Sequence, residues 1–381
     1  MRILISNCRL VSPGIDWPQA YIAVQDQYIS YVGTEPPVGD FAQVIDGTGM
    51  IATPGFIDIH SHGRSNFDFC DATHTAFAAI GCGKLSDGVT SFLATTLTIA
   101  SSDLRKVCQE ARYYAEKCTA GATLLGIHLE GPFINPNCLG AQNPDFVQQP
   151  HIALVDELNA IYPVKKVSYS PELPDGLELT TALRERGIMP SGGHSDADYE
   201  CFVQNRDAGM RHLTHFCNVM TPLHHLHFGM VGGGLLSQDV YVEMICDGVH
   251  LCDQMIELIA KLKGPERMML ITDSIRAAAM PDGDYSLGGL PVLVKNGKAT
   301  LHSGTVAGST LLFQHGLKHL LRNTDLPLCE VIRTTSWNQA ESLKLGKRGK
   351  LEPSFVADIV LLDQNLDPRK TICGGTLKWV G

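Results

Sequence analysis

The chain has 381 residues and a formal net charge of −10, with 44% hydrophobic and 18% charged residues. These values are typical of a globular protein with a large core, and the negative charge argues against nucleic acid or an anionic membrane as a partner. The first residues form no signal-peptide pattern, and no apolar run reaches membrane-spanning length, so we expect a cytoplasmic protein.

Twelve cysteines could pair into disulfide bonds, but their positions favour free thiols. No Cys-x-x-Cys pair occurs, and Cys108, Cys217 and Cys246 lie inside apolar stretches. Buried thiols of a cytosolic protein behave as small hydrophobic side chains. We therefore predict neither a disulfide framework nor a cysteine nucleophile.

Both ends of the chain have β character. Residues 1–53 contain short β-prone runs separated by turn-forming residues, without a helical period. After Gly349 a turn leads into another β-prone run, which ends at Asp363. We predict one small β-sandwich domain built from residues 1–53 and 346–381. Its first strands are expected at residues 2–5, 20–24 and 29–32.

Strand and helix signals alternate between residues 54 and 345. One amphipathic helix is expected to begin with Ser101 or Ser102 as its cap, and others follow near residues 154–161 and 255–262. Strands that alternate with helices in this way predict an α/β fold of the (β/α)8 TIM barrel type. The predicted barrel strands are 56–62, 89–95, 124–130, 166–170, 188–194, 211–215, 242–247 and 268–273.

The first predicted barrel strand ends in two histidines, His60 and His62. Side chains of a strand alternate between faces, so residues two apart share a face and both imidazoles can reach one metal ion. Gly63 follows, where a loop can open towards a cleft. The alternative is a pair of solvated histidines, because a His-x-His pattern arises easily by chance among 15 histidines.

Other polar side chains also fall at predicted strand ends, which is where barrels of this type carry their chemistry. Histidine nitrogens with a carboxylate suit zinc, iron or manganese. Independent accidents would not gather such residues on one rim, so we predict a metal centre there. The residues concerned are His60, His62, Glu130, His194, His215 and Asp273.

Some polar residues have simpler explanations. His128 shares a face with Glu130 and is interpreted as a hydrogen-bonded core histidine, and His212 as a surface or packing residue. Asp247 and Asp273 could each cap a strand end. The run of His224, His225 and His227 could be a solvated loop or an adventitious surface metal site.

Longer motifs surround the candidate ligands. They are Pro54 to His62, His128 to Phe133, Gly193 to Ala197, Thr214 to Met220, Cys246 to His250, Thr272 to Ser274, Pro281 to Gly289, Thr305 to Ser309 and Ala357 to Asp363. The first and the last resemble the amidohydrolase superfamily. The others resemble the N-acetylglucosamine-6-phosphate deacetylase family within it, and the similarity runs through essentially the whole chain.

This resemblance implies metal-dependent hydrolysis of an acetamide, giving acetate and glucosamine 6-phosphate. It implies a divalent metal, one or two ions per chain, with zinc as the first choice and iron or manganese as alternatives. Glu130, His194 and His215 are the implied main ligands, and His60 and His62 match members with a second metal. Asp273 would take a proton from water and pass it to the leaving amine.

The resemblance also implies a homodimer in which the partner subunit helps to close the site around the amino sugar. Two departures stand out. Gln142 replaces a histidine that polarises the acetyl carbonyl, and Leu226 replaces an arginine that reaches the 6-phosphate of the other subunit. His225 or His227 could compensate for that arginine. The implied substrate-binding residues are Gln142, Asn218, Val219, His225, His227, His250 and Ser309.

Several alternatives stay open. Because of Leu226, the substrate could be an unphosphorylated N-acetylhexosamine, a galactosamine epimer or another N-acyl compound. A D-aminoacylase-like enzyme would need a cationic clamp for a carboxylate, and none is obvious. A cyclic-amide hydrolase would use a carboxylated lysine, but Lys165 and Lys166 lie at the start of the fourth strand. A non-catalytic scaffold typically loses ligands, and here none is lost.

Overall fold

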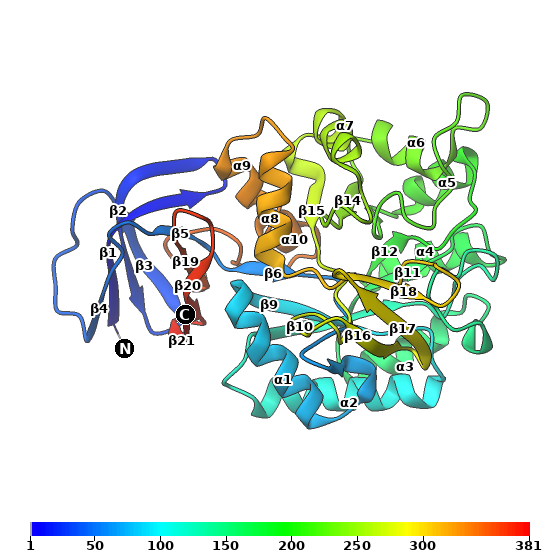
Figure 1. Ribbon diagram of the computed structural model, residues 1–381, viewed down its shortest axis with the longest axis horizontal. Helices are drawn as coiled ribbons and strands as arrows, with labels where there is room; N and C mark the ends of the chain where they lie inside the picture. Colours follow the sequence, from blue (N-terminus) through cyan, green and yellow to red (C-terminus); the bar gives the residue numbers. More distant parts are fainter. Residues whose placement is uncertain (1) are drawn as a thin grey trace.

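Eight parallel strands form the barrel of the computed structural model, which describes residues 2–381 (Figure 1). Almost every barrel-strand residue is buried, as expected for strands covered on both faces. The predicted (β/α)8 fold is therefore confirmed. The strands are β6 (Phe56–Asp58), β9 (Val89–Thr95), β10 (Thr123–Glu130), β11 (Val164–Tyr169), β12 (Met189–Gly192), β13 (His212–Leu213), β14 (Tyr241–Met244) and β15 (Met268–Leu270), in that order around the sheet.

The barrel closes through the segments that follow β6 and β15. The Asp273 N–H donates to the His60 carbonyl over 2.8 Å, and the His62 N–H donates to the Ser274 carbonyl over 2.8 Å. The predicted strand 56–62 was too long, since β6 ends at Asp58. Beyond Asp58 the backbone bonds mainly to the 273–274 segment, and it keeps one backbone hydrogen bond to β9, from the Thr95 N–H to the Ser61 carbonyl over 3.2 Å.

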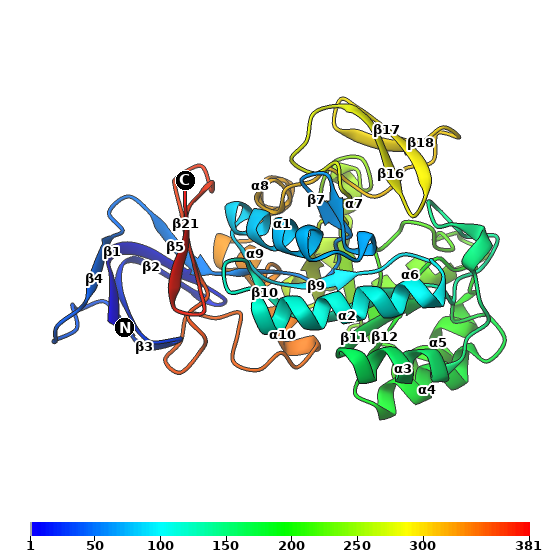
Figure 2. The same cartoon turned by 90° about the horizontal axis from the view of Figure 1, so that it is seen from below.

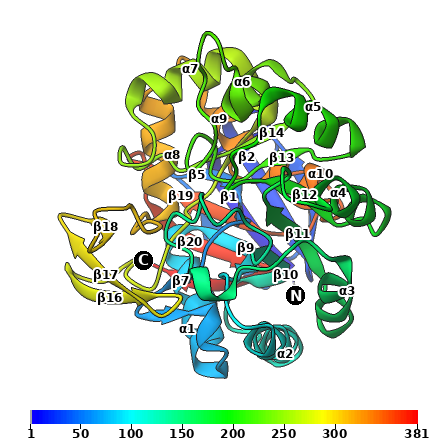
Figure 3. The ribbon, with the colours of Figure 1, turned by 90° about the vertical axis from the view of Figure 1, so that its right-hand side faces the viewer.

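Helices surround the barrel (Figure 3). The predicted cap of α2 was wrong, because the N-cap is Ala100 and Ser101 is already helical. The Ser101 hydroxyl instead accepts a hydrogen bond from the Gln148 amide over 3.1 Å. The helices are α1 (His74–Lys84), α2 (Ser101–Lys117), α3 (Ile152–Ile161), α4 (Gly176–Glu185), α5 (Tyr199–Ala208), α6 (Gly229–Leu236), α7 (Asp253–Lys263), α8 (Phe313–Arg322), α9 (Leu328–Arg333) and α10 (Trp337–Ser342), with short 3₁₀ turns at Phe69–Asp71, Leu85–Asp87, Pro144–Phe146 and Pro265–Arg267.

A second sheet unites the two ends of the chain beside the barrel (Figure 2). In it β5 pairs antiparallel with β19, and alternate residues of β1 point into a separate apolar core that includes Ile3, Ile22 and Ile359. This is the predicted sandwich, while its boundaries at residues 53 and 346 remain a prediction. Its strands are β1 (Arg2–Ser12), β2 (Ile15–Gln25), β3 (Tyr28–Gly33), β4 (Gln43–Asp46), β5 (Ile51–Pro54), β19 (Ile359–Leu362), β20 (Pro368–Cys373) and β21 (Thr376–Val380).

Two small antiparallel sheets were not predicted. One is the pair β7 (Gly63–Arg64) and β8 (Phe67–Asp68), directly after His62. The other is inserted between β15 and α8 and lies on the side of the barrel away from the sandwich (Figure 2). It consists of β16 (Gly283–Leu287), β17 (Leu290–Lys295) and β18 (Lys298–Leu301).

All twelve cysteines are free thiols, as predicted, but only four are buried, since Cys82 and Cys252 are exposed and the other six, Cys217 among them, are half-buried. Within residues 2–381, no helix combines the length and the apolar character needed to cross a membrane.

A buried ion pair supports the barrel below His60. Lys84 Nζ lies 2.8 Å from Asp58 Oδ2, which also accepts a hydrogen bond from the Thr272 hydroxyl over 2.7 Å. We expect Lys84→Met to lower the free energy of unfolding by about 3–5 kcal/mol, because it leaves a buried carboxylate without its cation. Denaturant titration measures this loss. The exposed pair of Lys106 and Asp103 is the control, since Lys106→Met should cost at most about 1 kcal/mol. Equal losses for both variants would contradict the prediction.

Candidate active site

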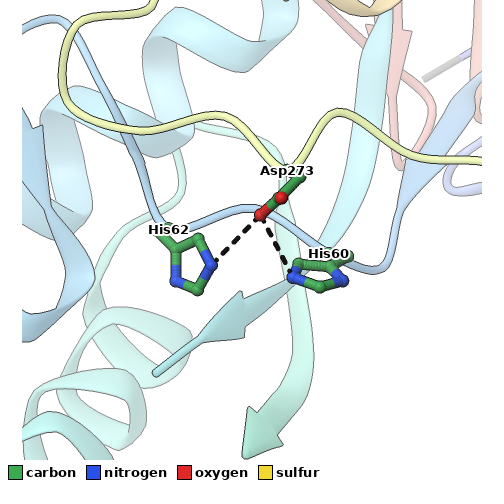
Figure 4. A group of neighbouring side chains, drawn as sticks. All are labelled: His60, His62 and Asp273. Atoms are coloured by element: carbon green, nitrogen blue, oxygen red, sulfur yellow. Dashed lines mark ion pairs between the residues drawn. The ribbon is translucent and has the colours of Figure 1, made fainter. Parts of the chain in front are cut away.

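Two groups of buried side chains meet at the carboxyl ends of the barrel strands. One consists of His60, His62 and Asp273, and the other of Glu130, His194 and His215. Within each group, the potential ligand atoms lie within 4.8 Å of one another. Figure 4 shows the first group, in which the two imidazoles approach the Asp273 carboxylate from different sides. Its Oδ1 lies 3.2 Å from Nε2 of each histidine.

The Glu130 carboxylate connects the two groups. Its Oε1 lies 3.3 Å from Nε2 of His215, 3.5 Å from Nε2 of His194 and 3.2 Å from Nε2 of His60. Its Oε2 lies 3.2 Å from Nε2 of His62. One carboxylate therefore faces all four predicted histidine ligands. The structure brings together the five metal ligands that the sequence predicted, with Asp273 beside them.

The donor atoms of these groups fit metal ions. His60 Nε2 and Glu130 Oε1 are buried and have no aligned hydrogen-bond partner within residues 2–381. Nε2 of His194 and Nε2 of His215 face each other at 3.0 Å. Buried polar atoms normally have partners, so the convergence of these unpaired donor atoms fits the binding of a cation. Imidazole nitrogens with carboxylate oxygens are ligands that suit divalent transition metals.

The surroundings keep the carboxylates of the site ionised. Burial raises the pKa of Glu130, but the nearby histidines outweigh burial and hold this pKa well below its ordinary value. Asp273 behaves in the same way, with its pKa lowered by His60 and His62 against the effect of burial. Burial lowers the pKa of His62, yet Asp273 and Glu130 raise it overall to about 9. The ionised carboxylates of Glu130 and Asp273 therefore favour a cation at this site.

The backbone at three site residues is unusual. The φ angles of His194, His215 and Asp273 are 51°, 33° and 49°, in the left-handed region that side chains rarely adopt. Such conformations persist at functional sites when the surrounding structure fixes them. Asp273 is fixed on both sides of its peptide, because its carbonyl also accepts a hydrogen bond from the Ser309 N–H over 2.8 Å.

Comparison with known proteins agrees with this geometry. A model of the amidohydrolase family matches residues 51–378. The chain belongs to the amidohydrolase family. It is 33% identical to the N-acetylglucosamine-6-phosphate deacetylase of Bacillus subtilis strain 168, over 99% of this chain and 97% of that one. It is also 33% identical to the N-acetylgalactosamine-6-phosphate deacetylase of Escherichia coli O157:H7, over 88% and 89% of the two chains. The solved structure of N-acetylglucosamine-6-phosphate deacetylase from Thermotoga maritima superposes with a TM-score of 0.91 at 33% identity, over 99% of this chain and all of that one.

A cavity of this amidohydrolase opens directly onto both metal-ligand groups. Leu97, Ala141, Leu287 and Val306 give it an apolar wall, and Leu287 comes from β16 of the unpredicted sheet. Four of the predicted substrate-binding residues line the cavity. They are Gln142, Asn218, Val219 and His250.

Gln142 is held in one orientation. Its Oε1 accepts a hydrogen bond from the Thr98 N–H over 2.8 Å, so its Nε2 points the other way and donates to Glu130 Oε2 over 2.7 Å. The predicted donor is therefore present at the site of the amidohydrolase, but it is engaged with Glu130, a candidate metal ligand. It can steady Glu130 as well as contact a substrate.

His250 presents an imidazole with a raised pKa to the cavity. Its Nδ1 donates to Asp247 Oδ2 over 2.8 Å, and the N–H groups of Val249 and His250 donate to Asp247 Oδ1. Burial lowers the pKa of His250, but Asp247 outweighs burial and raises it. Asp247 is thus more than a strand-end cap. When it is protonated, this imidazole suits an anionic substrate group.

Three predicted substrate-binding residues do not reach the cavity within one chain. The Ser309 hydroxyl is already used, because it donates to the Thr272 carbonyl and accepts from the Leu311 N–H. His225 and His227 lie on an exposed loop together with Leu226, which is 72% exposed. This loop borders a different hollow, lined by Tyr199 and Thr221 among others.

His128 and His212 are consistent with the interpretations made from the sequence. His128 is a hydrogen-bonded core residue between the Thr95 and Ser168 hydroxyls, at 3.2 and 2.7 Å. His212 is fully buried and is thus a packing residue, not a surface one.

Sequence reasoning considered Lys166 only as a carboxylated lysine and missed Glu243, with which Lys166 forms a buried ion pair inside the barrel. The available signal was charge within otherwise apolar strands, namely the Lys165-Lys166 pair in β11 and the single Glu243 in β14.

Proposed function

We propose that this chain hydrolyses the acetamide of N-acetylglucosamine 6-phosphate, releasing acetate and glucosamine 6-phosphate. The observation that carries the proposal is one cavity that joins the two candidate metal groups to His250, a histidine paired with a carboxylate. Metal ligands, a proton-transfer group and an anion-binding group are then within reach of one small substrate. The joined residues are Glu130, His194, His215, Asp273, Asn218, Val219 and His250. The named activity of the similar proteins supports the same reaction.

The two groups would hold two divalent ions that share Glu130. Zinc is our first choice for this set of nitrogens and carboxylate oxygens, with iron and manganese as the alternatives. Such an ion supplies Lewis acidity and lowers the pKa of water from about 15.7 to about 7 when it is bound. His60 and His62 would serve one position, and His194 and His215 the other.

Asp273 is the proposed proton carrier. Its carboxylate is ionised and buried at the cavity wall, so it can accept a proton from the attacking water. Asp273 then returns this proton to the amine nitrogen as the C–N bond breaks, because an uncharged amine leaves more easily than its anion. Gln142 holds Glu130 in place during this exchange through its amide N–H.

His250 is the proposed anchor of the 6-phosphate, with the backbone near Asn218 and Val219. Asp247 holds the ring and favours its charged form. The loop that carries Leu226 would complete this site only from a partner subunit, since it is exposed and away from the cavity in its own chain. We therefore propose a homodimer, and a cytoplasmic location remains a prediction from the sequence.

Substrate comparison tests this proposal. We expect kcat/KM for N-acetylglucosamine 6-phosphate to exceed that for N-acetylglucosamine by about 30-fold or more, the scale of one charged contact to a buried phosphate. N-acetylgalactosamine 6-phosphate is the third substrate and tests the epimer. Equal rates with and without the phosphate, or a faster epimer, would overturn the choice of substrate.

The Leu226→Arg variant tests the partner contribution. We expect it to raise the preference for the phosphorylated sugar further, while Leu223→Arg, on the same exposed loop, leaves that preference unchanged. An identical response of the two variants would show that position 226 does not face the phosphate.

A further inference from the structure

A second buried ion pair, distinct from that of Lys84 and Asp58, contacts His60, and the mechanism above does not use it. Lys166 of β11 contacts Glu243 of β14 through Nζ and Oε1, and both side chains are fully buried. The other oxygen of Glu243, Oε2, lies 3.0 Å from Nδ1 of His60. Glu243 Oε2 also accepts a long hydrogen bond of 3.4 Å from the His215 N–H. One carboxylate therefore touches residues of both metal groups.

Stability alone does not explain this pair. Taking two charges out of water costs about as much as their attraction returns, and well-packed apolar side chains often replace such pairs without loss. The same face of the strand accepts apolar residues, since Tyr241 and Ile245 lie two positions on either side of Glu243 and are both buried. A pair retained at this cost, in contact with a candidate ligand, indicates a function for it.

The contact with Glu243 decides where His60 carries its proton. A neutral imidazole has one N–H and one lone pair. The Glu243 carboxylate only accepts hydrogen bonds, so Nδ1 must be the protonated nitrogen. Nε2 then offers its lone pair, and it lies 3.2 Å from both Glu130 Oε1 and Asp273 Oδ1. A metal ion binds only the nitrogen that carries the lone pair. The hydrogen-bond partner of the other nitrogen fixes the orientation of the imidazole ring.

We infer that Glu243, held in place by Lys166, is a positioning residue that selects the tautomer of His60 and thereby maintains the cation position of His60, His62 and Asp273. This inference rests on the two-ion centre of the proposed function. It concerns one of the two positions, since the side-chain nitrogens of His194 and His215 do not contact Glu243 within residues 2–381.

The Glu243→Gln variant should reverse the tautomer. The Lys166 ammonium takes the amide oxygen, because a charge-assisted hydrogen bond is the stronger one. The amide NH₂ then faces Nδ1 of His60 and turns that nitrogen into an acceptor. The proton moves to Nε2 and points at the cation position. In the double variant Lys166→Met/Glu243→Gln, the amide is free to turn its oxygen back to His60.

Zinc binding to the metal-free, full-length chain tests this inference. Calorimetric titration with zinc gives the affinity of each position, and elemental analysis gives the zinc per chain. In Glu243→Gln we expect one of the two positions to weaken by about 10–100-fold while the other changes little. The double variant should recover most of this loss. Lys166→Met/Glu243→Leu, which offers no acceptor to His60, should not recover it.

Asp358→Asn is the matched control, because Asp358 pairs with Arg348 in the sandwich, away from the site. It should lower the melting temperature without changing zinc binding. Should Glu243→Gln fail to fold, the two double variants still decide the question. If Glu243→Gln binds two zinc ions as tightly as wild type does, or if the two double variants bind zinc equally well, this inference is overturned while the proposed function stands. A single zinc in wild type would overturn the two-ion centre, and this inference with it.

Discussion

Asp273→Asn is expected to lower kcat by about 10²–10⁴-fold, the usual contribution of general acid–base catalysis. Asparagine has the same shape but can neither accept the proton of water nor deliver it to the amine. The fold should remain, since the backbone N–H and carbonyl of Asp273 make the hydrogen bonds that link it to His60 and Ser309. Metal at Glu130, His194 and His215 should also remain.

Steady-state rates and elemental analysis of the purified variant measure both parts of this expectation. The dependence of the rate on pH gives a further test of the role of Asp273. Because the pKa of Asp273 is lowered, the wild-type rate should persist as pH falls through the ordinary carboxyl range and decline only below it, whereas the variant lacks this acid limb. Asp282→Asn, on the exposed sheet insertion, is the control and should keep the wild-type rate. A rate above about a tenth of wild type in Asp273→Asn would exclude the proton-carrier role.

The barrel could be predicted because its signals are local. Apolar strand runs alternate with amphipathic helices, and the rule that chemistry lies at the carboxyl ends then placed Glu130, His194, His215 and Asp273 on one rim. The strand ends themselves were less certain. His60 and His62 lie beyond β6, which ends at Asp58, because the backbone after Asp58 bonds to the 273–274 segment as well as to Thr95, and no local pattern encodes this closure.

The features of the site that could not be predicted depend on contacts between residues that are far apart in the sequence. Lys166 and Glu243 are 77 residues apart, and only the curvature of the barrel brings them together. The same holds for Gln142, whose orientation depends on the backbone of Thr98. Ser309 illustrates the opposite error, because a hydroxyl beside a motif residue turned out to be consumed by backbone groups.

The Glu130→Ala variant should have the largest effect on metal content. Glu130 faces ligands of both groups, so its removal takes an oxygen from each proposed cation position. It also takes the negative charge that offsets two ions in a buried site. We expect the metal content to fall well below one ion per chain. Activity should be lost with it, because water then returns towards its ordinary pKa of about 15.7.

Elemental analysis after dialysis against metal-free buffer measures this loss in wild type, Glu130→Ala and Glu130→Gln. The amide of Glu130→Gln keeps one oxygen and the packing, so it should retain more metal than the alanine variant but less than wild type. Glu157→Ala, which removes an exposed carboxylate paired with Arg105 on the helix surface, should bind metal as wild type does. An undiminished metal content in Glu130→Ala would show that Glu130 is not a metal ligand and does not link the two groups. Loss of metal with retained activity would separate the proposed reaction from the metal centre.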